Sequence, residues 1–395
     1  MSDPWITIIG IGEDGLAGLS DASCEALRRA EIIFGGPRHL TLVDAKNRGR
    51  AWPVPFSIDP VLAEKGRAIV ILASGDPFWH GAGGSLSRAL SPQDWTCHPA
   101  ASTFSLAASR LGWPIEESFC FGLHAAPFER ILPVLSRCQK IICLMRDGAA
   151  VGAMAAWLTQ RGFGPARLSV LEALGGPAER LRTVTADGFN LADVTHPVAV
   201  AIDVQGAKGL PRASGLPDNL FATDGVMTKR PIRALTLSAL APRPGEVLWD
   251  LGAGSGSIAV EWCLAAPGTT ALAVELRADR AAYIRQNAQA FGLGHRLSVV
   301  ETDWPEGLAA LPRPDAVFIG GGVDSPGLET VWGLIHAGTR LVINAVTIES
   351  EMLLAGWHRH RGGDLYRFDA AQATPIGQML GWTPSRPVMQ WSVVK

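Results

Sequence analysis

Short runs of β-branched and aliphatic residues alternate with Ala-, Leu- and Arg-rich stretches from one end of the chain to the other. This alternation is typical of βαβ units, so it predicts an α/β fold built on mostly parallel sheets. We expect two groups of buried strands, the first at residues 6–9, 32–34, 68–72, 141–144 and 198–202, and the second at residues 247–250, 270–275, 297–301, 316–319 and 340–344.

The length of 395 residues favours two or more domains, because a single compact core rarely serves so long a chain. Residues 205–217, between the two groups of strands, are rich in Gly, Pro and Ser and lack apolar periodicity. Such composition is typical of a linker. We therefore predict a first domain at residues 1–204, a linker at 205–220 and a second domain at 221–395.

The overall composition argues against several classes of protein. The 35 Lys and Arg residues are balanced by 37 Asp and Glu residues, so a nucleic-acid partner held through its phosphates is not expected. The six cysteines show no CxxC spacing, which favours buried free thiols over a metal site or disulfides. The first residues lack a cationic leader and no run of 18 apolar residues occurs, so we expect a cytoplasmic protein without a membrane partner.

The sharpest motif lies in the second domain, where residues 244–261 read as a strand, a Gly-rich turn and a helix. Gly252, Gly254 and Gly256 let the backbone turn tightly and pass close to a ligand. Their G-x-G-x-G spacing differs from the G-x-G-x-x-G of dinucleotide sites. Asp250, two residues before the first glycine, suits a cationic ligand. Glu275, at the end of the next strand, is placed to accept both hydrogens of a ribose diol.

Together with Asp303 and Trp304, an acid and a ring that suit an adenine pocket, these residues resemble the class I, Rossmann-like family of methyltransferases that use S-adenosylmethionine (SAM). The resemblance covers about residues 222–395 and implies a Rossmann-like fold. It also implies that SAM is bound by Asp250, Gly252, Ala253, Gly254, Ser255, Gly256, Glu275, Asp303, Trp304 and Gly320. The alternative is a glycine turn that only packs a helix on a sheet.

Two further segments of the second domain bear on its substrate. Residues 318–322 read Phe-Ile-Gly-Gly-Gly, where methyltransferases of planar amines usually carry Asn/Asp-Pro-Pro-Tyr/Phe, so a bulky or anionic substrate is favoured. Residues 224–238 resemble the corresponding segment of the precorrin decarboxylating methyltransferase family. That resemblance implies that Thr228 lies against SAM. It also implies that the cations of the segment face substrate carboxylates, which makes Lys229 and Arg233 candidate catalytic residues. An ordinary solvated helix N-terminus is the alternative, and the sequence leaves both open.

The first domain begins with a weaker signal. Residues 10–15 read Gly-Ile-Gly-Glu-Asp-Gly, which satisfies G-x-G-x-x-G, but the next strand ends in Gly-Gly and lacks the acid that a dinucleotide ribose requires. More telling is the run 73–81, Ala-Ser-Gly-Asp-Pro-Phe-Trp-His-Gly, directly after an apolar strand. Ser102 and Thr103 then open a helix, and Met145 follows a further strand.

In this order and spacing the segments resemble the tetrapyrrole (corrin/porphyrin) methylase family over about residues 4–204. The resemblance implies two α/β lobes with SAM in the cleft between them, bound by Gly10, Gly12, Ser74, Gly75, Asp76, Trp79, Ser102, Thr103 and Met145. For the Asp76 side chain, ordering of its loop is favoured over chemistry. Glu13 and Asp14 stand where many relatives have Pro-Gly. His80 and His124, near the family's substrate loops, are candidate catalytic or substrate contacts, with satisfied core histidines as the alternative.

Two methylase types fused in this order resemble the bifunctional, decarboxylating precorrin methyltransferases of cobalamin biosynthesis. The resemblance implies that the first domain methylates C5 of precorrin-6B and the second methylates C15, with loss of the ring C acetate carboxyl as CO2 to give precorrin-8. Two SAM molecules are then used per chain. A macrocycle whose own carbons are nucleophilic needs orientation more than a protein base, which fits the lack of a nucleophilic triad in the sequence.

Other readings of the sequence stay open. One is a methyltransferase of another macrocycle or of RNA, and a second is a SAM-binding module with one degenerate domain, which the altered turn at residues 10–15 favours. For any of these a homo-oligomer is expected.

Overall fold

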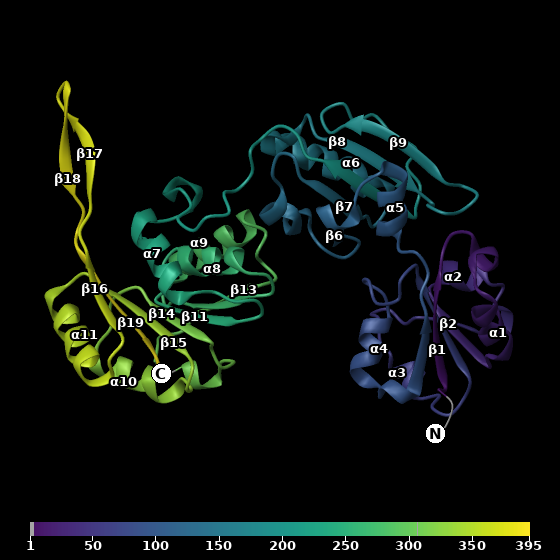
Figure 1. Cartoon of the computed structure of the whole chain (residues 1–395), viewed down its shortest axis with the longest axis horizontal. Helices are drawn as coiled ribbons and strands as arrows, with labels where there is room; N and C mark the ends of the chain where they lie inside the picture. The colour runs from purple at the N-terminus through teal and green to yellow at the C-terminus, as the bar shows by residue number, and fades with distance from the viewer. Residues whose placement is uncertain (1–3, 306) are drawn as a thin grey trace. The chain divides into compact units, whose positions relative to one another are not determined.

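The computed structural model describes residues 4–305 and 307–395 (Figure 1). The chain divides into two compact units: Met1–Phe128 with Val134–Gly209, called unit 1, and Glu129–Pro133 with Leu210–Lys395, called unit 2. The division falls between residues 209 and 210, and the short segment 129–133 packs with unit 2. Helices and strands alternate in both units, which confirms the predicted α/β class.

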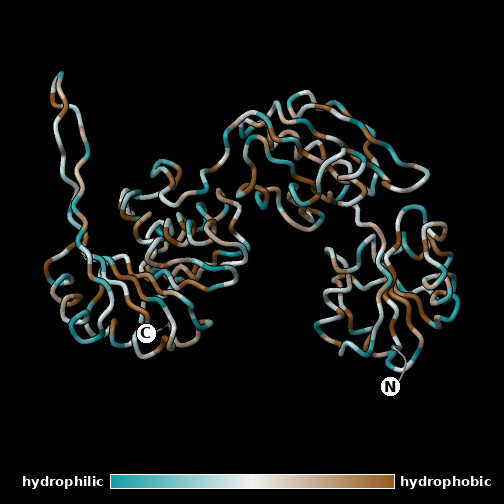
Figure 2. Tube along the Cα trace, in the orientation of Figure 1, coloured by the Kyte–Doolittle hydropathy of each residue, from teal (hydrophilic) through white to brown (hydrophobic). Residues whose placement is uncertain are grey.

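The first lobe of unit 1 is a parallel sheet in the order β3-β2-β4-β1-β5. Its strands are β1 (Ile6–Ile11), β2 (Ile32–Gly35), β3 (Gly49–Ala51), β4 (Ile69–Ser74) and β5 (Trp95–His98). Successive side chains of a strand point to opposite faces of the sheet. Ile9 and Ile11 of β1 therefore pack beneath α1 (Asp21–Arg29) and α2 (Pro37–Leu42). Ile6 and Ile8 pack on the other side with α3 (Asp59–Leu62) and α4 (Gly83–Ala89). Figure 2 shows these strands as the hydrophobic centre of the lobe.

The second lobe of unit 1 is a mixed sheet in the order β6-β7-β10-β8-β9. Its strands are β6 (Ser118–Gly122), β7 (Lys140–Leu144), β8 (Arg167–Glu172), β9 (Arg180–Thr185) and β10 (Val198–Asp203), and its helices are α5 (Thr103–Leu111) and α6 (Gly148–Leu158). Only β6 and β7 are parallel neighbours, and the other pairs are antiparallel. The expectation of mostly parallel sheets is therefore wrong for this lobe. The β8–β9 connection is too short for a crossover helix, so it joins antiparallel strands.

Unit 2 is a seven-stranded sheet in the order β13-β12-β11-β14-β15-β19-β16. The strands are β11 (Val247–Leu251), β12 (Thr270–Val274), β13 (Leu297–Val300), β14 (Ala316–Ile319), β15 (Arg340–Ala345), β16 (Asp364–Phe368) and β19 (Val388–Val394). The first five run parallel, and β19 lies antiparallel between β15 and β16. The strand order reverses between β11 and β14, and ligands of such sheets bind at the carboxyl ends beside this point.

Helices cover both faces of the unit 2 sheet (Figure 1). One face packs with α7 (Arg230–Leu240), α8 (Ser257–Ala265) and α9 (Ala278–Ala290) through a core that includes Leu248 and Phe318. The other packs with α10 (Ser325–Leu334) and α11 (Ile348–Arg361) through Trp249, Val317 and Leu341. Neighbouring residues of one strand thus serve opposite cores, as the pleat of a buried parallel strand requires.

A separate two-stranded sheet, β17 (Ala371–Ile376) and β18 (Met379–Pro384), extends from the ends of β16 and β19 in unit 2 (Figure 1). Among residues 4–305 and 307–395, no helix combines the length and the apolar character that spanning a membrane demands.

Candidate functional site

A cleft of about 670 Å³ lies within unit 1, and both lobes line it. It lies at the carboxyl ends of β1, β2 and β4, where the loops of a parallel sheet gather. Many of the residues predicted from the sequence meet here: Gly12, Ser74, Gly75, Trp79, His80, Ser102, Thr103, His124 and Met145.

The floor of this cleft is backbone packed against backbone. Gly75 has a φ of +56°, and a Cβ at this position would lie 2.8 Å from the Cα of Ser102 and 2.9 Å from the carbonyl oxygen of Ala101. A Cβ on Gly10 would overlap the Gly75 carbonyl oxygen. Gly10 therefore packs behind the cleft instead of lining it. The Ser102 hydroxyl accepts the Ser105 N–H at 3.0 Å and begins α5, which fixes the facing loop.

Acidic residues around the cleft order its loops. Asp76 accepts the Phe78 N–H at 2.8 Å, which is the loop-ordering role favoured from the sequence. The Asp14 carboxylate fills the space beside Gly12, where a Cβ would lie 2.6 Å from its Oδ1. Glu13 forms an ion pair with Arg38. Of the two acids that replace Pro-Gly in this turn, Glu13 thus has an ion-pair partner and Asp14 packs against the glycine backbone of the turn.

Arg38 and His39 were not predicted as site residues, yet both line the cleft beside Ser74. Arg38 Nη2 donates to the Ser74 hydroxyl at 3.0 Å, and His39 Nε2 lies 2.8 Å from the same oxygen. Burial, with the neighbouring Arg38 charge, lowers the pKa of His39 to about 4, so this ring is neutral at pH 7. A signal was present in the sequence, because both residues lie in the first turn of α2, just after the Gly35-Gly36-Pro37 turn that ends β2.

The fold brings His80 and His124 together at the end of β6. A Cβ on Gly122 would lie 3.2 Å from Cγ of His80 and 3.2 Å from Cε1 of His124. The ring of His80 also lies 6.0 Å from that of Phe104, centroid to centroid. Both predicted histidines are exposed on the cleft wall, so neither belongs to the hydrophobic core.

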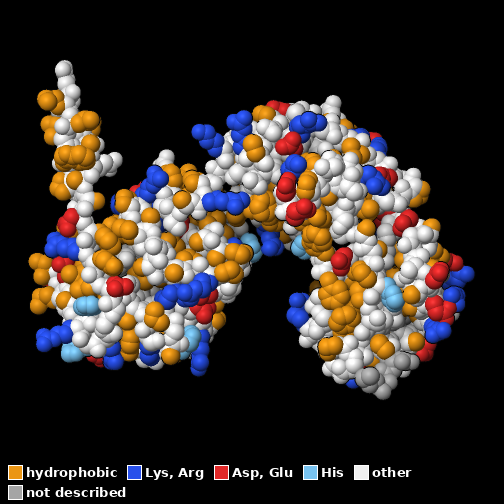
Figure 3. Space-filling model, viewed as in Figure 1, with side chains coloured by type: hydrophobic (Ala, Val, Ile, Leu, Met, Phe, Trp, Pro, Cys, Tyr) orange, Lys and Arg blue, Asp and Glu red, His pale blue; other side chains and the backbone are white. Residues whose placement is uncertain are grey.

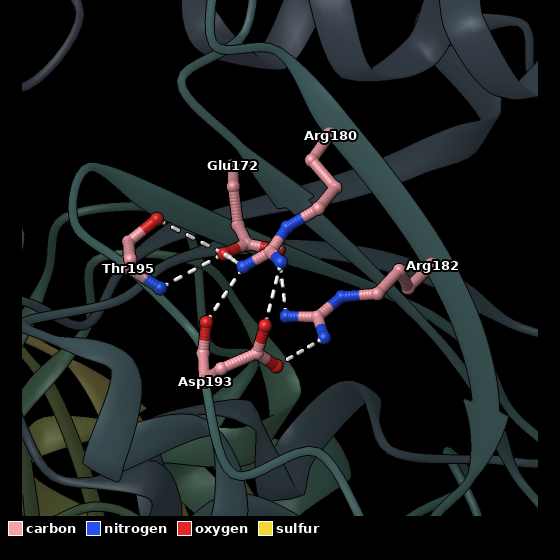
Figure 4. Close-up of polar contacts among 5 residues, drawn as sticks. All are labelled: Glu172, Arg180, Arg182, Asp193 and Thr195. Atoms are coloured by element: carbon pink, nitrogen blue, oxygen red, sulfur yellow. Dashed lines mark hydrogen bonds and ion pairs between the residues drawn. The ribbon is translucent and has the colours of Figure 1, made fainter.

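A buried carboxylate holds the loop on the other wall (Figure 4). Glu172 is 1% exposed and accepts hydrogen bonds from Arg180, Arg182 and the Thr195 N–H, at 2.6, 2.9 and 2.8 Å. Burial alone raises the pKa of Glu172, but these hydrogen bonds outweigh it and bring the pKa down to about 2. Asp193 joins the cluster through Arg180 at 2.7 Å. The cluster fixes residues 193–195, which lead directly to His196 and Pro197 of the cleft wall.

In unit 2 the glycine turn after β11 is closed by an acid. Gly252, Gly254 and Gly256 have φ values of +67°, +59° and +71°. Glu275, 6% exposed, accepts the Gly254 N–H at 2.9 Å and the Arg277 N–H at 3.0 Å. The carboxylate predicted to meet a ribose therefore lies against the turn.

Other predicted residues of unit 2 surround this turn. Trp304 places its Nε1 3.8 Å from the position of a Cβ on Gly252. The Ser255 hydroxyl is buried and has no hydrogen-bond partner among the described residues, so it can serve a ligand. Asp303 and Gly320 are exposed after β13 and β14, and Ala253 donates its N–H to the Val274 carbonyl at 3.1 Å.

Asp250 lies beneath the turn. It is 1% exposed, and its Oδ2 accepts the Ala259 N–H of α8 at 3.1 Å. Burial raises the pKa of Asp250 to about 7, with a further contribution from the Glu275 charge. The expectation that this carboxylate faces a cationic ligand as an open charge needs correction, because the protein itself covers the group and favours its neutral form.

Arg233 also needs correction as a substrate-facing cation. Its side chain is fully buried and donates to Glu261 Oε1 at 2.5 Å, Asp218 Oδ1 at 3.0 Å and the Thr228 carbonyl at 2.6 Å. Glu261 in turn accepts the N–H groups of Gly215 and Leu216 at 2.6 and 2.9 Å. Arg233 thus ties the chain before α7 to α8.

Of the other residues predicted on this segment, Lys229 is exposed at the start of α7 and donates to the Gly225 carbonyl at 3.2 Å. Thr228 is half-buried beside it. The Lys229 ammonium group and the Thr228 hydroxyl therefore remain available to a ligand.

The two halves of the chain match two family models. Residues 6–189 match the model described as Tetrapyrrole (Corrin/Porphyrin) Methylases, and residues 219–395 match the Precorrin methyltransferase domain. A Sinorhizobium protein named Precorrin-6Y C(5,15)-methyltransferase [decarboxylating] is 47% identical over 99% of this chain and 97% of its own. The chain belongs to the precorrin-6Y C5,15-methyltransferase (decarboxylating) family. Membership of this family confirms the resemblance drawn from the motifs, and its methyl donor is SAM.

Two further relatives match only part of the chain. The crystal structure of the C-terminal domain of a precorrin-6Y C5,15-methyltransferase from Rhodobacter capsulatus is 50% identical, with a TM-score of 0.46, over 47% of this chain and all of that one. A Pyrobaculum calidifontis protein named Probable cobalt-precorrin-6B C(15)-methyltransferase (decarboxylating) is 39% identical over 34% of this chain and 72% of its own.

We expect Arg233→Met to destabilise unit 2, because Glu261 is then left as a buried charge without its guanidinium. Breaking one side of a buried pair typically lowers the free energy of unfolding by about 3–5 kcal/mol. Urea unfolding measures the loss, and Arg277→Met, which removes an exposed pair with Asp279, is the control with an expected loss below about 1 kcal/mol. If the unfolding midpoint is unchanged and substrate binding is weaker, the structural role is wrong and Arg233 contacts the substrate.

We expect Asp250→Asn to stabilise ligand-free unit 2 at pH 8 and to change little near pH 4.5. In the unfolded chain Asp250 ionises near pH 4, whereas in the fold it keeps its proton up to about pH 7. The raised pKa therefore lowers stability progressively as pH rises through this window. Asn keeps an acceptor for the Ala259 N–H and has no charge to bury. Melting temperatures of both proteins from pH 4.5 to 8.5 test this, and parallel curves would contradict it.

Proposed function

We propose that unit 1 methylates C5 of precorrin-6B (precorrin-6Y), and that unit 2 methylates C15 with loss of the ring C acetate carboxyl as CO2, giving precorrin-8. The observation that carries this proposal is a glycine-built turn at a strand end in each unit. The chain also aligns over 99% of its length with a relative that is named for methylation at both C5 and C15. The Pyrobaculum relative, named for C15 and decarboxylation, matches only 34% of this chain, which supports the assignment of that half-reaction to one unit.

Both turns fit a SAM molecule. In unit 2 the Ser255 hydroxyl, which has no partner among the described residues, and the buried Glu275 carboxylate offer polar groups where Gly252 and Gly254 leave the backbone uncovered. In unit 1 the backbone beside Gly75 faces a cleft of about 670 Å³, within the size range of ligand pockets. We therefore propose two SAM molecules per chain. SAM supplies an electrophilic methyl group, and the protein's residues supply orientation, which can contribute up to ~7–11 kcal/mol.

The unit 1 cleft suits a large ring that carries several carboxylates. Trp52, Phe56 and Trp79 offer apolar surface on its walls, while Arg38 and Arg146 offer positive charge. We assign Arg38 as a carboxylate anchor, because its guanidinium lies in the cleft and already holds one carboxylate, that of Glu13. A substrate carboxylate that takes the place of Glu13 would keep the charge of Arg38 paired.

Unit 2 suits the same substrate in a different way. A Cβ on Gly321 or Gly322, beyond β14, would meet no atom within 4 Å, so this side of the turn is open to a bulky molecule. Lys229 is exposed on the segment before α7 and is available to substrate carboxylates. The carboxylate that leaves as CO2 must not be held too tightly in the ground state, so we assign Lys229 to the carboxylates that stay.

The proposal is tested by removing one SAM site at a time. Titration calorimetry of the full chain is expected to show two SAM molecules bound per chain. Gly75→Val or Gly254→Val is each expected to reduce this number to one. Both glycines have a positive φ, and at Gly75 the neighbouring backbone also leaves no room for a side chain. Gly84→Val and Gly294→Val, where a Cβ would have open space, are the matched controls and should keep both. A single SAM site in the wild type would favour the alternative in which one of the two domains is degenerate and does not bind SAM.

Mass spectrometry of the product assigns the reactions to the units. With the wild type, a gain of two methyl groups and a loss of one CO2 is expected from the precorrin. Gly254→Val should give a product that keeps its carboxyl group and gains at most one methyl. Release of CO2 by Gly254→Val would refute the assignment of decarboxylation to unit 2.

Arg38→Met is expected to raise the KM for the precorrin in C5 methylation by about 10- to 100-fold, since a charge-assisted hydrogen bond contributes about 1.5–3 kcal/mol. The KM for SAM should stay within about twofold of the wild-type value, because Arg38 is not assigned to SAM. Arg50→Met, which removes an exposed arginine bonded to the Asn47 carbonyl, is the control. Equal losses for SAM and precorrin would contradict the anchor role.

A further inference from the structure

Glu13, in the turn after β1, lies against the arginine that we assign as a carboxylate anchor. It forms an ion pair with Arg38, and the two side chains, both in the lining of the unit 1 cleft, are 18% and 35% exposed. On the outer surface of unit 1, acidic and basic side chains also lie next to one another (Figure 3), but a pair there such as Arg67 and Glu31 is 46% and 51% exposed. The Glu13–Arg38 pair therefore belongs to the cleft and not to the solvated surface.

The Arg38 guanidinium is also held by uncharged groups. Its Nη2 donates to the Ser74 hydroxyl at 3.0 Å and lies 3.1 Å from Nε2 of His39. The Glu13 carboxylate meets the other terminal nitrogen, Nη1. Because His39 is neutral at pH 7, Arg38 is the one positive charge among these four residues. The contact with Ser74 keeps the guanidinium in place when Glu13 moves away.

Arg38 requires an anionic partner. Burial lowers the pKa of Arg38 from its ordinary value, which means that its charge is partly removed from water. A cation in such a place is unfavourable unless it is paired. Glu13 supplies the pair from within the chain, and a substrate carboxylate would supply the same interaction from outside. Two carboxylates at one edge of the guanidinium repel each other, so they compete for Arg38.

The turn that carries Glu13 has a fixed backbone. On one side the loop after β8 packs so closely that a Cβ on Gly176 would lie 2.5 Å from the Cβ of Glu13. On the other side Gly15, with a φ of +60°, packs against α2, where a Cβ would lie 3.3 Å from the Leu42 carbonyl oxygen. Rotation about the side-chain bonds of Glu13 therefore releases Arg38 without moving either lobe.

We propose that Glu13 is a placeholder carboxylate, which pairs with Arg38 until a carboxylate of the substrate takes over the guanidinium. The inference rests on the proposed role of Arg38 as an anchor and adds to it a competitor inside the protein. The placeholder keeps the cation paired at every stage of binding. It also weakens the binding of substrate and product, because each must displace Glu13 before it reaches Arg38.

The exchange selects ligands by charge and by size. A carboxylate that replaces Glu13 forms the same charge-assisted hydrogen bond, whereas a methyl ester forms a weaker one and leaves Glu13 in place. A small anion such as acetate competes poorly, because Glu13 is tethered and has a high effective concentration at Arg38. The ligand that displaces Glu13 is therefore a carboxylate on a larger molecule that makes further contacts with the cleft.

Binding of precorrin-6B to the full chain tests the proposal without turnover, since Trp52 and Trp79 line the cleft and report on it by fluorescence quenching. Glu13→Gln should lower the Kd for the precorrin about three- to tenfold, because a competing ion pair is removed. Glu13→Asp, whose shorter side chain reaches Arg38 less well, should lower the Kd by a smaller factor. Asp14→Asn removes an equal charge that packs against the glycine backbone of the same turn. It is the matched control and should stay within about twofold, because screening by salt weakens such unpaired charges.

Two further measurements locate the effect at Arg38. Arg38→Met alone should raise the Kd for the precorrin, and adding Glu13→Gln to it should bring a gain in affinity no larger than that of Asp14→Asn, because the placeholder acts through Arg38. Acetate should compete with the precorrin for the Glu13→Gln protein and much less for the wild type. The methyl ester of the precorrin should bind both proteins equally.

An unchanged or higher Kd in Glu13→Gln would overturn the proposal. An equal gain in Asp14→Asn would also overturn it, because only the general loss of negative charge would then matter. A full gain in the protein that lacks Arg38 places the action of Glu13 elsewhere. An unchanged Kd in Arg38→Met contradicts the anchor itself, so failure of the proposed function is distinguished from failure of the placeholder. Melting temperatures establish that the variants are folded, and Glu13→Asp decides the question if Glu13→Gln is not.

Discussion

Close approach of backbone to backbone is the constraint on which both sites depend. In unit 1 the loop after β4 packs so tightly on the start of α5 that Gly75 has no room for a side chain. In unit 2 three glycines with positive φ carry the chain from β11 into α8. In both proposed sites, peptide groups would face the ligand, and these have fixed positions and cannot rotate away.

Charged groups next to these turns serve mainly to hold loops. Arg233 and Glu261 are both buried, and together they fix residues 215–218 and the carbonyl of Thr228. Glu172 does the same for residues 193–195 in unit 1. Ion pairs of this kind add little net stability compared with apolar packing, but losing one member leaves a buried charge. Their benefit lies in the geometry they impose on the loops beside the unit 1 cleft and the unit 2 glycine turn.

The two units offer different environments to one class of substrate. The unit 1 cleft combines aromatic walls with Arg38, Arg146 and a neutral His39. Unit 2 places its acids against the glycine turn, where Glu275 is buried and Asp250 has a pKa raised to about 7. Two arginines therefore line the unit 1 cleft, while unit 2 buries Glu275 and a largely neutral Asp250 at its turn and keeps Lys229 exposed.

The sequence by itself determined the α/β class and the family, and it pointed to the glycine turns of both proposed sites. The positions of Gly75, the three glycines after β11 and Glu275 could be predicted because each lies at the end of a strand, which a few neighbouring residues encode. The roles of Arg233 and Arg38 were decided only by the tertiary structure. Arg233 meets Glu261 through the packing of α7 on α8, and Arg38 meets Ser74 because β2 and β4 are neighbours. A long charged side chain binds whichever partner the fold brings within reach, and sequence spacing carries no record of that distance.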